Sequence, residues 1–249
     1  MRDRAAFLRP IAHRGLHDAA KGIVENTAAA FEAAIAKGYG IECDLRPAGC
    51  ATPMVFHDLA LDRLIDGQGP LAAHAAPALK RLRYRTGTGG MIDFPDLLDL
   101  VAGRVPLLVE IKTEWDAPDA GYLEAIANSA AGYRGPIGLM SFDPAVMAGI
   151  RALAPDVPRG IVSGKFEGDG WWRERLGAER AFALSNFLES GPAAPDFYAY
   201  DVKALPTPVT RFVREVLGLP LFTWTVRTQD ERATAALWAD APIFEGYEP

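Results

Sequence analysis

The residues of this chain that could do chemistry gather in its first quarter, at or beside the ends of short apolar runs. They are His13, Arg14, Glu42, Asp44 and His57. Two histidines can divide the work of a general base and a general acid, because a histidine pKa of about 6.5 makes both forms accessible near neutral pH. Carboxylates hold hard divalent cations, and a guanidinium suits a pair of phosphate oxygens. The cluster therefore indicates phosphoester chemistry.

The composition is that of a globular protein, and it narrows the range of partners. The chain has 249 residues, of which 49% are hydrophobic and 23% charged, enough to bury a full core. Its formal net charge is −6, whereas a general binder of nucleic acid or of anionic membranes needs a basic surface. We therefore expect no nucleic-acid partner, and any recognition of phosphate has to be local.

The sequence predicts neither a membrane segment nor a disulfide framework. The first ten residues carry charges, but no apolar stretch as long as a signal peptide or transmembrane helix follows them, so we expect a cytoplasmic protein. Cys43 and Cys50 are too few for a disulfide framework and lack a zinc-type cluster, and we expect both to be reduced. Cys43 lies between Glu42 and Asp44, so in a strand it points away from them, into packing.

Short apolar runs alternate with longer amphipathic stretches almost to the last residue, and such repeated strand and helix units imply a parallel sheet. The eight predicted strands are Pro10–His13, Gly40–Leu45, Val105–Ile111, Ile137–Ser141, Arg159–Val162, Phe197–Tyr200, Leu221–Val226 and Pro242–Phe244. The predicted helices between them are Thr27–Lys37, Phe94–Ala102, Ala120–Ala131, Pro144–Leu153, Trp171–Leu184, Thr207–Leu217 and Gln229–Ala239. Asp93 and Asp143 are predicted N-caps, because each precedes a helix with a proline at its start.

Eight units in a chain of this length predict an α/β fold, a single (β/α)8 TIM barrel. A doubly wound open sheet is the alternative, but the chain lacks a nucleotide-binding glycine loop: Gly87-Thr88-Gly89-Gly90 has no lysine and no following helix, and we interpret it as a flexible connection. No linker or repeat divides the chain, so residues 1–249 are predicted to form one domain. Residues Asp62–Met91 predict an irregular loop excursion after the second strand.

A barrel would bring the chemically capable residues together, because active sites in this fold collect at the carboxyl ends of the strands. His13 ends the first predicted strand. Glu42 and Asp44 lie near the end of the second, and their spacing of two places both carboxylates on the same face, where they can share one cation. Glu110 and Lys112 close the third strand with the same spacing.

At this point the chain resembles a known family, the glycerophosphodiester phosphodiesterases. The matching elements are His-Arg-Gly at 13–15, Glu-Asn-Thr at 25–27, Glu-x-Asp at 42–44, His-Asp at 57–58 and Glu-Ile-Lys at 110–112. In the family they occur in this order on a (β/α)8 barrel. The resemblance spans residues 11 to about 228, with its specificity concentrated before residue 113. Each element alone is a weak signal, whereas the ordered set is a strong one.

The resemblance implies a role for each of these positions. His13 and His57 would be the catalytic acid and base, and Glu42, Asp44 and Glu110 would bind one divalent cation. Three carboxylates offer hard oxygen ligands that suit Mg²⁺ or Ca²⁺, with Mn²⁺ also possible. The cation would offset charge in the transition state.

The resemblance also implies a set of substrate-binding residues. Arginine and lysine would hold phosphate oxygens, the Glu-Asn pair would line and brace the site, and two aromatic residues would lie near the glycerol end. These residues are Arg14, Lys112, Glu25, Asn26, Phe142 and Trp224. Trp224 fits a core aromatic about equally well, since it lies inside an apolar run.

The implied reaction is hydrolysis of a small-molecule glycerophosphodiester to an alcohol and sn-glycerol 3-phosphate. The sequence does not assign the acid and the base between the two histidines. It also does not choose water or a neighbouring glycerol hydroxyl as the nucleophile, and it does not specify the head group, the preferred metal or the oligomeric state.

Three other readings compete with this one. A sphingomyelinase D-type phospholipase has a similar barrel, but such enzymes are typically secreted with disulfides, and this chain has two cysteines. A phosphatidylinositol phospholipase C shares the two-histidine barrel, yet the Glu-Asn-Thr and Glu-Ile-Lys elements fit it poorly. A catalytically idle barrel that binds a phosphorylated ligand is disfavoured because the histidines, carboxylates, arginine and lysine are all retained.

The sequence departs from the family pattern in four places, one of which is Met91-Ile92-Asp93-Phe94, where the family has Ile-Pro-Thr-Leu. Residues Leu16–Val24 form a longer insert than is common, so His17 and Asp18 could reach the site. The expected Arg-Thr pair after the second strand reads Arg63-Leu64. The last strand usually ends in Thr-Asp before a proline, whereas this chain reads Phe244-Glu245-Gly246. We therefore expect an altered substrate shape with the same chemistry.

Overall fold

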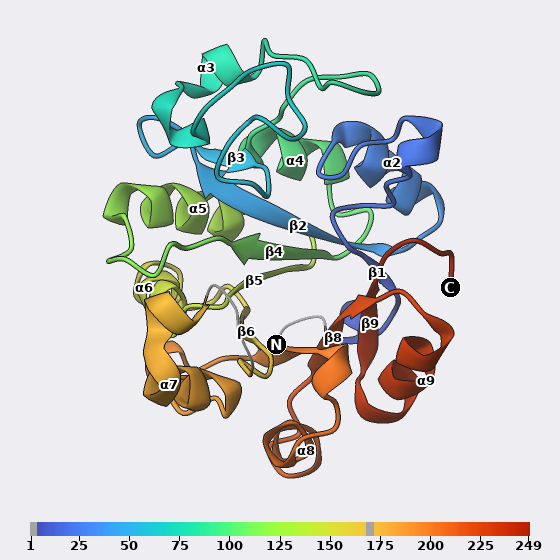
Figure 1. The fold of residues 1–249 in the computed structure, drawn as a ribbon, viewed down its shortest axis with the longest axis vertical. Helices are drawn as coiled ribbons and strands as arrows, with labels where there is room; N and C mark the ends of the chain where they lie inside the picture. Colours follow the sequence, from blue (N-terminus) through green and yellow to red (C-terminus); the bar gives the residue numbers. More distant parts are fainter. Residues whose placement is uncertain (1–3, 168–171) are drawn as a thin grey trace.

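A closed barrel of parallel strands organises the molecule (Figure 1). It was analysed as a computed structural model that describes residues 4–167 and 172–249. Within these residues the sheet closes because β1 (Ile11–Ala12) pairs in parallel with both β2 (Gly40–Pro47) and β9 (Ala241–Phe244). The other parallel strands are β4 (Leu107–Ile111), β5 (Ile137–Ser141), β6 (Arg159–Ser163), β7 (Phe197–Asp201) and β8 (Leu221–Val226). The predicted eight-stranded TIM barrel is confirmed, and the open-sheet alternative is wrong.

Helices cover the outside of the barrel between successive strands (Figure 1). They are α2 (Ala28–Ala36), α4 (Phe94–Val101), α5 (Ala120–Gly132), α6 (Pro144–Leu153), α7 (Trp172–Ser185), α8 (Pro208–Glu215) and α9 (Gln229–Trp238). The predicted positions are confirmed, with ends that shift by one or two residues; Trp171 lies outside the described residues. Asp93 and Asp143 are N-caps as predicted, because their carboxylates accept the N–H groups of Asp96 and Ala145.

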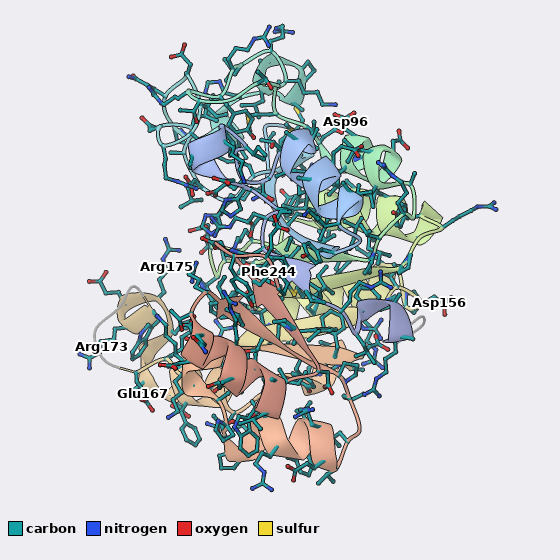
Figure 2. All side chains as sticks on the ribbon, turned by 90° about the vertical axis from the view of Figure 1, so that its right-hand side faces the viewer. Asp96, Asp156, Glu167, Arg173, Arg175 and Phe244 are labelled. Atoms are coloured by element: carbon teal, nitrogen blue, oxygen red, sulfur yellow. The ribbon has the colours of Figure 1, made fainter. Side chains whose placement is uncertain are left out.

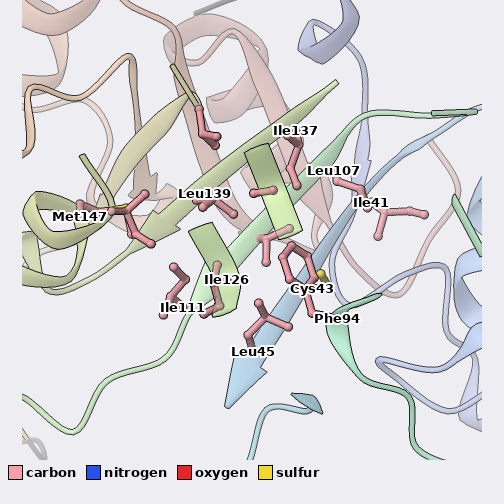
Figure 3. Close-up of a cluster of buried hydrophobic side chains, with 14 of the residues drawn as sticks. Ile41, Cys43, Leu45, Phe94, Leu107, Ile111, Ile126, Ile137, Leu139 and Met147 are labelled. Atoms are coloured by element: carbon pink, nitrogen blue, oxygen red, sulfur yellow. The ribbon is translucent and has the colours of Figure 1, made fainter. Parts of the chain in front are cut away.

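Successive side chains along a strand point alternately out of the barrel and into it, which separates the core residues from the site residues. In β2, Ile41, Cys43 and Leu45 face outward into the buried layer between barrel and helices. Figure 3 shows these side chains beside Leu107 of β4 and Phe94 of α4. Cys43 therefore lies in packing, as predicted. The intervening acidic residues point toward the barrel axis.

The amino end of the barrel interior is filled with apolar side chains. Phe7, from the short helix α1 (Arg4–Phe7), lies 6.3 Å from the ring of Phe222, and Phe222 lies 5.4 Å from Phe197. Gly160 makes room for this stack, because a Cβ atom there would lie 2.2 Å from the Phe197 ring. This end of the barrel is a packed core, which leaves the opposite end for a cavity. The sequence reading missed α1.

The segment after β2 forms a small lobe on one side of the barrel (Figure 1). β3 (Pro53–Val55) pairs antiparallel with the end of β2, which extends the second unit just before His57. The predicted irregular excursion follows, and it contains the short helices η2 (Leu71–Ala73) and α3 (Ala76–Leu79) and a buried apolar cluster of its own. Among the described residues, no helix is long and apolar enough to cross a membrane.

Candidate active site

A cavity of about 720 Å³ opens at the carboxyl end of the barrel. Arg175, which lines it, lies at the opposite end of the molecule from Asp156, in the loop before β6 (Figure 2). Eight of the eleven predicted site residues line the cavity: His13, Arg14, Glu42, His57, Glu110, Lys112, Phe142 and Trp224. The other three, Asp44, Glu25 and Asn26, lie behind this lining and contact residues within it.

Three carboxylates form a buried cluster at the cavity floor. One oxygen from each of Glu42, Asp44 and Glu110 lies within 4.8 Å of the others. The strand register explains this proximity, because Asp44 of β2 is paired with Glu110 of β4. The Lys112 Nζ atom lies 2.8 Å from Asp44 Oδ1 and 2.7 Å from Glu110 Oε1. Two neighbouring strands therefore supply one charged centre.

The cluster carries more negative charge than its neighbours offset. Burial, reinforced by the charge of Asp44, raises the pKa of Glu42 to about 7. Burial also acts to raise the pKa of Asp44, but the charges of Lys112 and Arg14 outweigh it and hold that pKa well below its usual range. A divalent cation would relieve the repulsion felt by Glu42, and carboxylate oxygens are the ligands that hard cations prefer. The donor set therefore fits the metal role predicted for these three residues.

His13 is held by a carboxylate from the last strand. Its Nδ1 atom lies 2.7 Å from Glu245 Oε2, and its Nε2 atom lies 3.9 Å from Glu42 Oε2. A carboxylate accepts hydrogen bonds, so Nδ1 donates its proton and Nε2 faces the acidic cluster. The hydrogen bond with His13 lowers the pKa of Glu245 to about 2, and Arg227, 2.9 Å away, adds to this effect. Glu245 is therefore an ionised support for the His13 ring.

His57 is supported in the same way within the excursion. Its Nδ1 atom lies 2.8 Å from Asp58 Oδ1. Arg63 contacts Asp58 at 2.5 Å and Glu25 at 2.7 Å, which fixes the carboxylate. The backbone carbonyl of His57 also accepts a hydrogen bond from Arg46 Nε. Burial lowers the pKa of His57 from its usual value, although the charge of Asp44 opposes the shift, and this favours the neutral ring.

Arg14, Glu25 and Asn26 form a brace behind the cluster. Arg14 Nη1 lies 2.7 Å from Glu25 Oε1, and Arg14 Nε lies 3.3 Å from Asp44 Oδ2. Asn26 donates to Asp44 Oδ2 at 2.8 Å and accepts from the Asp44 backbone N–H at 3.3 Å. The bracing expected of Glu25 and Asn26 is thus present, but in this structure neither side chain lines the cavity. Arg14 contributes to both the brace and the cavity.

The His-Arg-Gly element needs its glycine for a steric reason. Gly15 has a φ of +78°, and a Cβ atom there would lie 2.9 Å from the backbone of Ala30 in α2. The loop after β1 therefore passes against the start of α2, which keeps Arg14 directed toward the acidic cluster.

Two aromatic residues form another wall of the cavity. Phe142, which follows β5, and Trp224 of β8 lie with ring centroids 5.3 Å apart in an edge-to-face arrangement. The Trp224 Nε1 atom is buried and has no hydrogen-bond partner within the described residues. Trp224 lines the cavity and is therefore not sealed in the core.

The long insert after Gly15 does not line the cavity. Asp18 caps the short helix η1 (Ala19–Lys21) and pairs with Lys21 at 2.8 Å. Neither His17 nor Asp18 lines the cavity, but His17 lies close enough to His13, Arg14 and Glu245 for their charges to act on its pKa, which burial lowers. The insert instead contacts the glycine run of the excursion, where a Cβ atom on Gly87 would lie 2.3 Å from the Gly22 carbonyl. At Gly87 the run therefore makes a close contact between backbones, whereas Gly89 faces open space.

Sequence reasoning missed several charged residues of the cavity. Two of them continue patterns that were already visible: Arg46 is the next inward position of β2 after Asp44, and Glu114 follows Lys112 by two. Their side chains form an ion pair at 2.8 Å. Lys165, Asp201 and Arg227 lie at or just after the ends of β6, β7 and β8, Arg175 lies in α7, and all four line the cavity, while Glu245 supports it. Arg227 lies within the span of the family resemblance and Glu245 in one of the departures from it, but the sequence analysis assigned a role to neither.

Comparison with known proteins agrees with the geometry. The sequence model of the "Glycerophosphoryl diester phosphodiesterase family" matches residues 13–244. Mouse "Glycerophosphodiester phosphodiesterase 1" is 35% identical over 115 residues, which are 45% of this chain and 31% of that protein. The match thus spans about a third of the mouse protein.

Solved structures share the fold. A phosphodiesterase from Oleispira antarctica, in complex with the product sn-glycerol-3-phosphate, superposes with a TM-score of 0.72 at 19% identity, covering 95% of this chain and 92% of that one. A glycerophosphodiester phosphodiesterase from Thermotoga maritima has a TM-score of 0.70 at 21% identity, with coverages of 95% and 93%.

Proposed function

Because this chain belongs to the glycerophosphoryl diester phosphodiesterase family, we propose that it hydrolyses glycerophosphodiesters to an alcohol and sn-glycerol 3-phosphate. One observation carries the proposal. His13 and His57, each with a carboxylate on Nδ1, line one cavity together with Glu42 and Glu110 of the acidic cluster. A general acid, a general base and a cation site in one cavity are what phosphodiester hydrolysis requires.

We assign the proton transfers from the state of His57. Burial lowers the pKa of His57 and so favours the neutral ring, which can accept the proton of the attacking hydroxyl group as the oxygen–phosphorus bond forms. His13 then supplies a proton from Nε2 to the alkoxide as its bond to phosphorus breaks. The carboxylates of Asp58 and Glu245 orient the two rings throughout. The net change is one water consumed, with one alcohol and one phosphate monoester released.

The charged residues at the cavity floor would bind the phosphoryl group. Glu42, Asp44 and Glu110 would hold the divalent cation, which when bound supplies positive charge against the phosphoryl oxygens. Lys112 and Arg14 both form ion pairs with Asp44 of this cluster. Both therefore present positive charge at the place where the transition state gains negative charge. Phe142 and Trp224 would contact the glycerol moiety across the cavity.

A substrate panel tests this proposal directly. Glycerophosphocholine, glycerophosphoethanolamine and glycerophosphoglycerol would be offered with Mg²⁺, Mn²⁺ or Ca²⁺, and the release of sn-glycerol 3-phosphate would be measured with and without a chelator. We expect turnover of at least one diester and its loss when the chelator is added. If none of the diesters is cleaved with any of the three metals, the barrel binds a phosphorylated ligand without turnover.

A further inference from the structure

A second, smaller cavity adjoins the first. Its volume is about 210 Å³, and it lies between the end of β2, helix η2 of the excursion, the loop after β4 and the start of α5. Five residues line both cavities: Arg46, Leu59, Lys112, Thr113 and Glu114. The two spaces therefore share a wall, and part of a molecule bound at the acidic cluster can extend across it.

The inner surface of the second cavity is mainly apolar. Leu71, Ile111, Leu123 and Val146 line it and are buried. At the boundary with the first cavity, Leu59 leaves 53% of its surface exposed, which is unusual for a large apolar side chain beside a charged site. An apolar group that enters from the catalytic cavity would cover Leu59 and displace water from the buried residues behind it.

A buried hydroxyl in this cavity lacks a partner. Tyr122 of α5 lines the second cavity, and its Oη atom is buried with no hydrogen-bond partner within the described residues. Burial raises the pKa of the Tyr122 phenol well above its usual value, so the group stays protonated and can donate. An unpaired buried hydroxyl destabilises a protein, and an acceptor oxygen on a ligand would remove that penalty.

The charged side chains of the shared wall are held in ion pairs. Arg46 Nη1 lies 2.8 Å from Glu114 Oε1, and Arg175 lies 3.7 Å from the other oxygen of the same carboxylate. Lys112 completes the wall. Lys112 is already paired with Asp44 and Glu110, so within the described residues the wall offers a cation no unpaired carboxylate cluster of its own, although Asp116 and Asp119 also line the second cavity. A quaternary ammonium that passed this wall would lose hydration against the buried apolar residues behind it.

We propose that the second cavity binds the leaving alcohol of the substrate, and that this alcohol carries a short uncharged apolar chain with an oxygen that accepts a hydrogen bond from Tyr122. This inference rests on the proposed phosphodiesterase function and specifies its substrate class. The glycerol end would lie on the other side of the acidic cluster, against Phe142 and Trp224, which line only the first cavity. The phosphoryl group would then lie between the two cavities.

A homologous series of substrates tests this arrangement. Glycerophosphodiesters with methyl, ethyl, butyl and hexyl leaving groups would be compared by kcat/KM, together with a hexyl analogue that has one ether oxygen and with glycerophosphocholine. Each methylene buried in an apolar site should raise kcat/KM roughly three- to fourfold until the cavity is full. The choline diester should fall below the butyl diester.

A matched pair of variants locates the effect. Ala72 and Ala73 are adjacent exposed residues of η2, but only Ala72 lines the second cavity. Ala72→Phe should lower the butyl-to-methyl ratio of kcat/KM by about tenfold, since it excludes about two methylenes, whereas Ala73→Phe should keep the ratio of the parent enzyme. Tyr122→Phe should abolish the preference for the ether-containing analogue over the hexyl chain.

The outcomes separate this inference from the function on which it rests. A ratio that rises with chain length and falls only in Ala72→Phe supports the leaving-group cavity. Turnover that does not change with chain length, or a rise that persists in Ala72→Phe, overturns it while the phosphodiesterase function stands. If none of the diesters is cleaved, the proposed function fails and this inference fails with it.

Discussion

His13 and His57 are each supported by a carboxylate, but the two carboxylates come from different parts of the chain. In each, a carboxylate lies on Nδ1, at 2.7 Å for Glu245 and 2.8 Å for Asp58. Asp58 is the next residue in the sequence, whereas Glu245 is 232 positions away and reaches His13 only because β9 pairs with β1. One histidine is thus supported by a local motif and the other by the closure of the barrel.

The two supports are also fixed differently. Arg63 ties Asp58 to Glu25, so the His57 side is part of a network of charges between the excursion and the first loop. Glu245 has one guanidinium neighbour, Arg227, from the end of β8. We expect the two histidines to contribute comparably to turnover, and their supporting carboxylates to respond differently to mutation and to pH.

The largest effect is expected from removal of either ring. His13→Ala and His57→Ala should each lower kcat by roughly 10² or more, because each deletes one proton-transfer group. Steady-state release of sn-glycerol 3-phosphate measures this, and His74→Ala, in the excursion and away from both cavities, is the control. If either variant retains near-normal turnover with its fold intact, that histidine has no part in the mechanism.

The next effect compares the two supporting carboxylates. Glu245→Gln and Asp58→Asn keep the size of the side chain but remove the charge that orients the ring, and each should lower kcat roughly 10- to 100-fold. Circular dichroism would verify the fold. Glu245→Asp is a useful companion, since its carboxylate is one methylene too short to keep the 2.7 Å contact. Wild-type kinetics in Glu245→Gln would mean that the distant support is structural only.

A smaller effect distinguishes the guanidinium groups behind the two carboxylates. Arg63→Met releases both Asp58 and Glu25 and should lower kcat by about three- to tenfold. Arg227→Met releases one carboxylate and should have less effect. Because Arg63 is 48% exposed, its loss should change the free energy of unfolding by no more than about 1 kcal/mol. Equal kinetic losses in the two variants would contradict the proposed difference between the supports.

The smallest effect concerns pH and stability. The pKa of Glu245 is lowered from 4.5 to about 2 by its hydrogen bond with His13, so the stabilisation is present above pH 4.5 and is lost as the pH falls toward 2. Urea unfolding at pH 5 and pH 3 measures this effect. Between the two pH values, the free energy of unfolding of wild type should fall by about 1 kcal/mol more than that of Glu245→Gln. An identical pH dependence in the two proteins would show that the contact contributes nothing to barrel closure.

The part of the site that depends on local sequence patterns could be predicted from the sequence. Alternation with a period of two placed Glu42, Asp44 and Glu110 on the inner face, and the strand ends placed Glu42 and Glu110 at the cavity, with Asp44 directly behind its lining. His57 and Asp58 are adjacent in a recognisable motif. The barrel itself follows from the number and order of strands and helices.

The rest depends on contacts between distant segments, which no local pattern encodes. Glu245 looked like a departure from the family at the chain's end, and only the pairing of β9 with β1 gives it a function beside His13. Arg63 likewise follows no periodic pattern, since it lies in the excursion and acts by bridging two loops. Phe7 fills the base of the barrel from a helix too short for a periodic signal.

The most direct test of the central claim is hydrolysis of a glycerophosphodiester in oxygen-18-labelled water, followed by phosphorus NMR. If the cavity cleaves its substrate at phosphorus with the two histidines moving the protons, the product is sn-glycerol 3-phosphate with the label on its phosphoryl group. Release of an unlabelled phosphate monoester, with the label in the alcohol, would contradict the account, as would the absence of any glycerol phosphate.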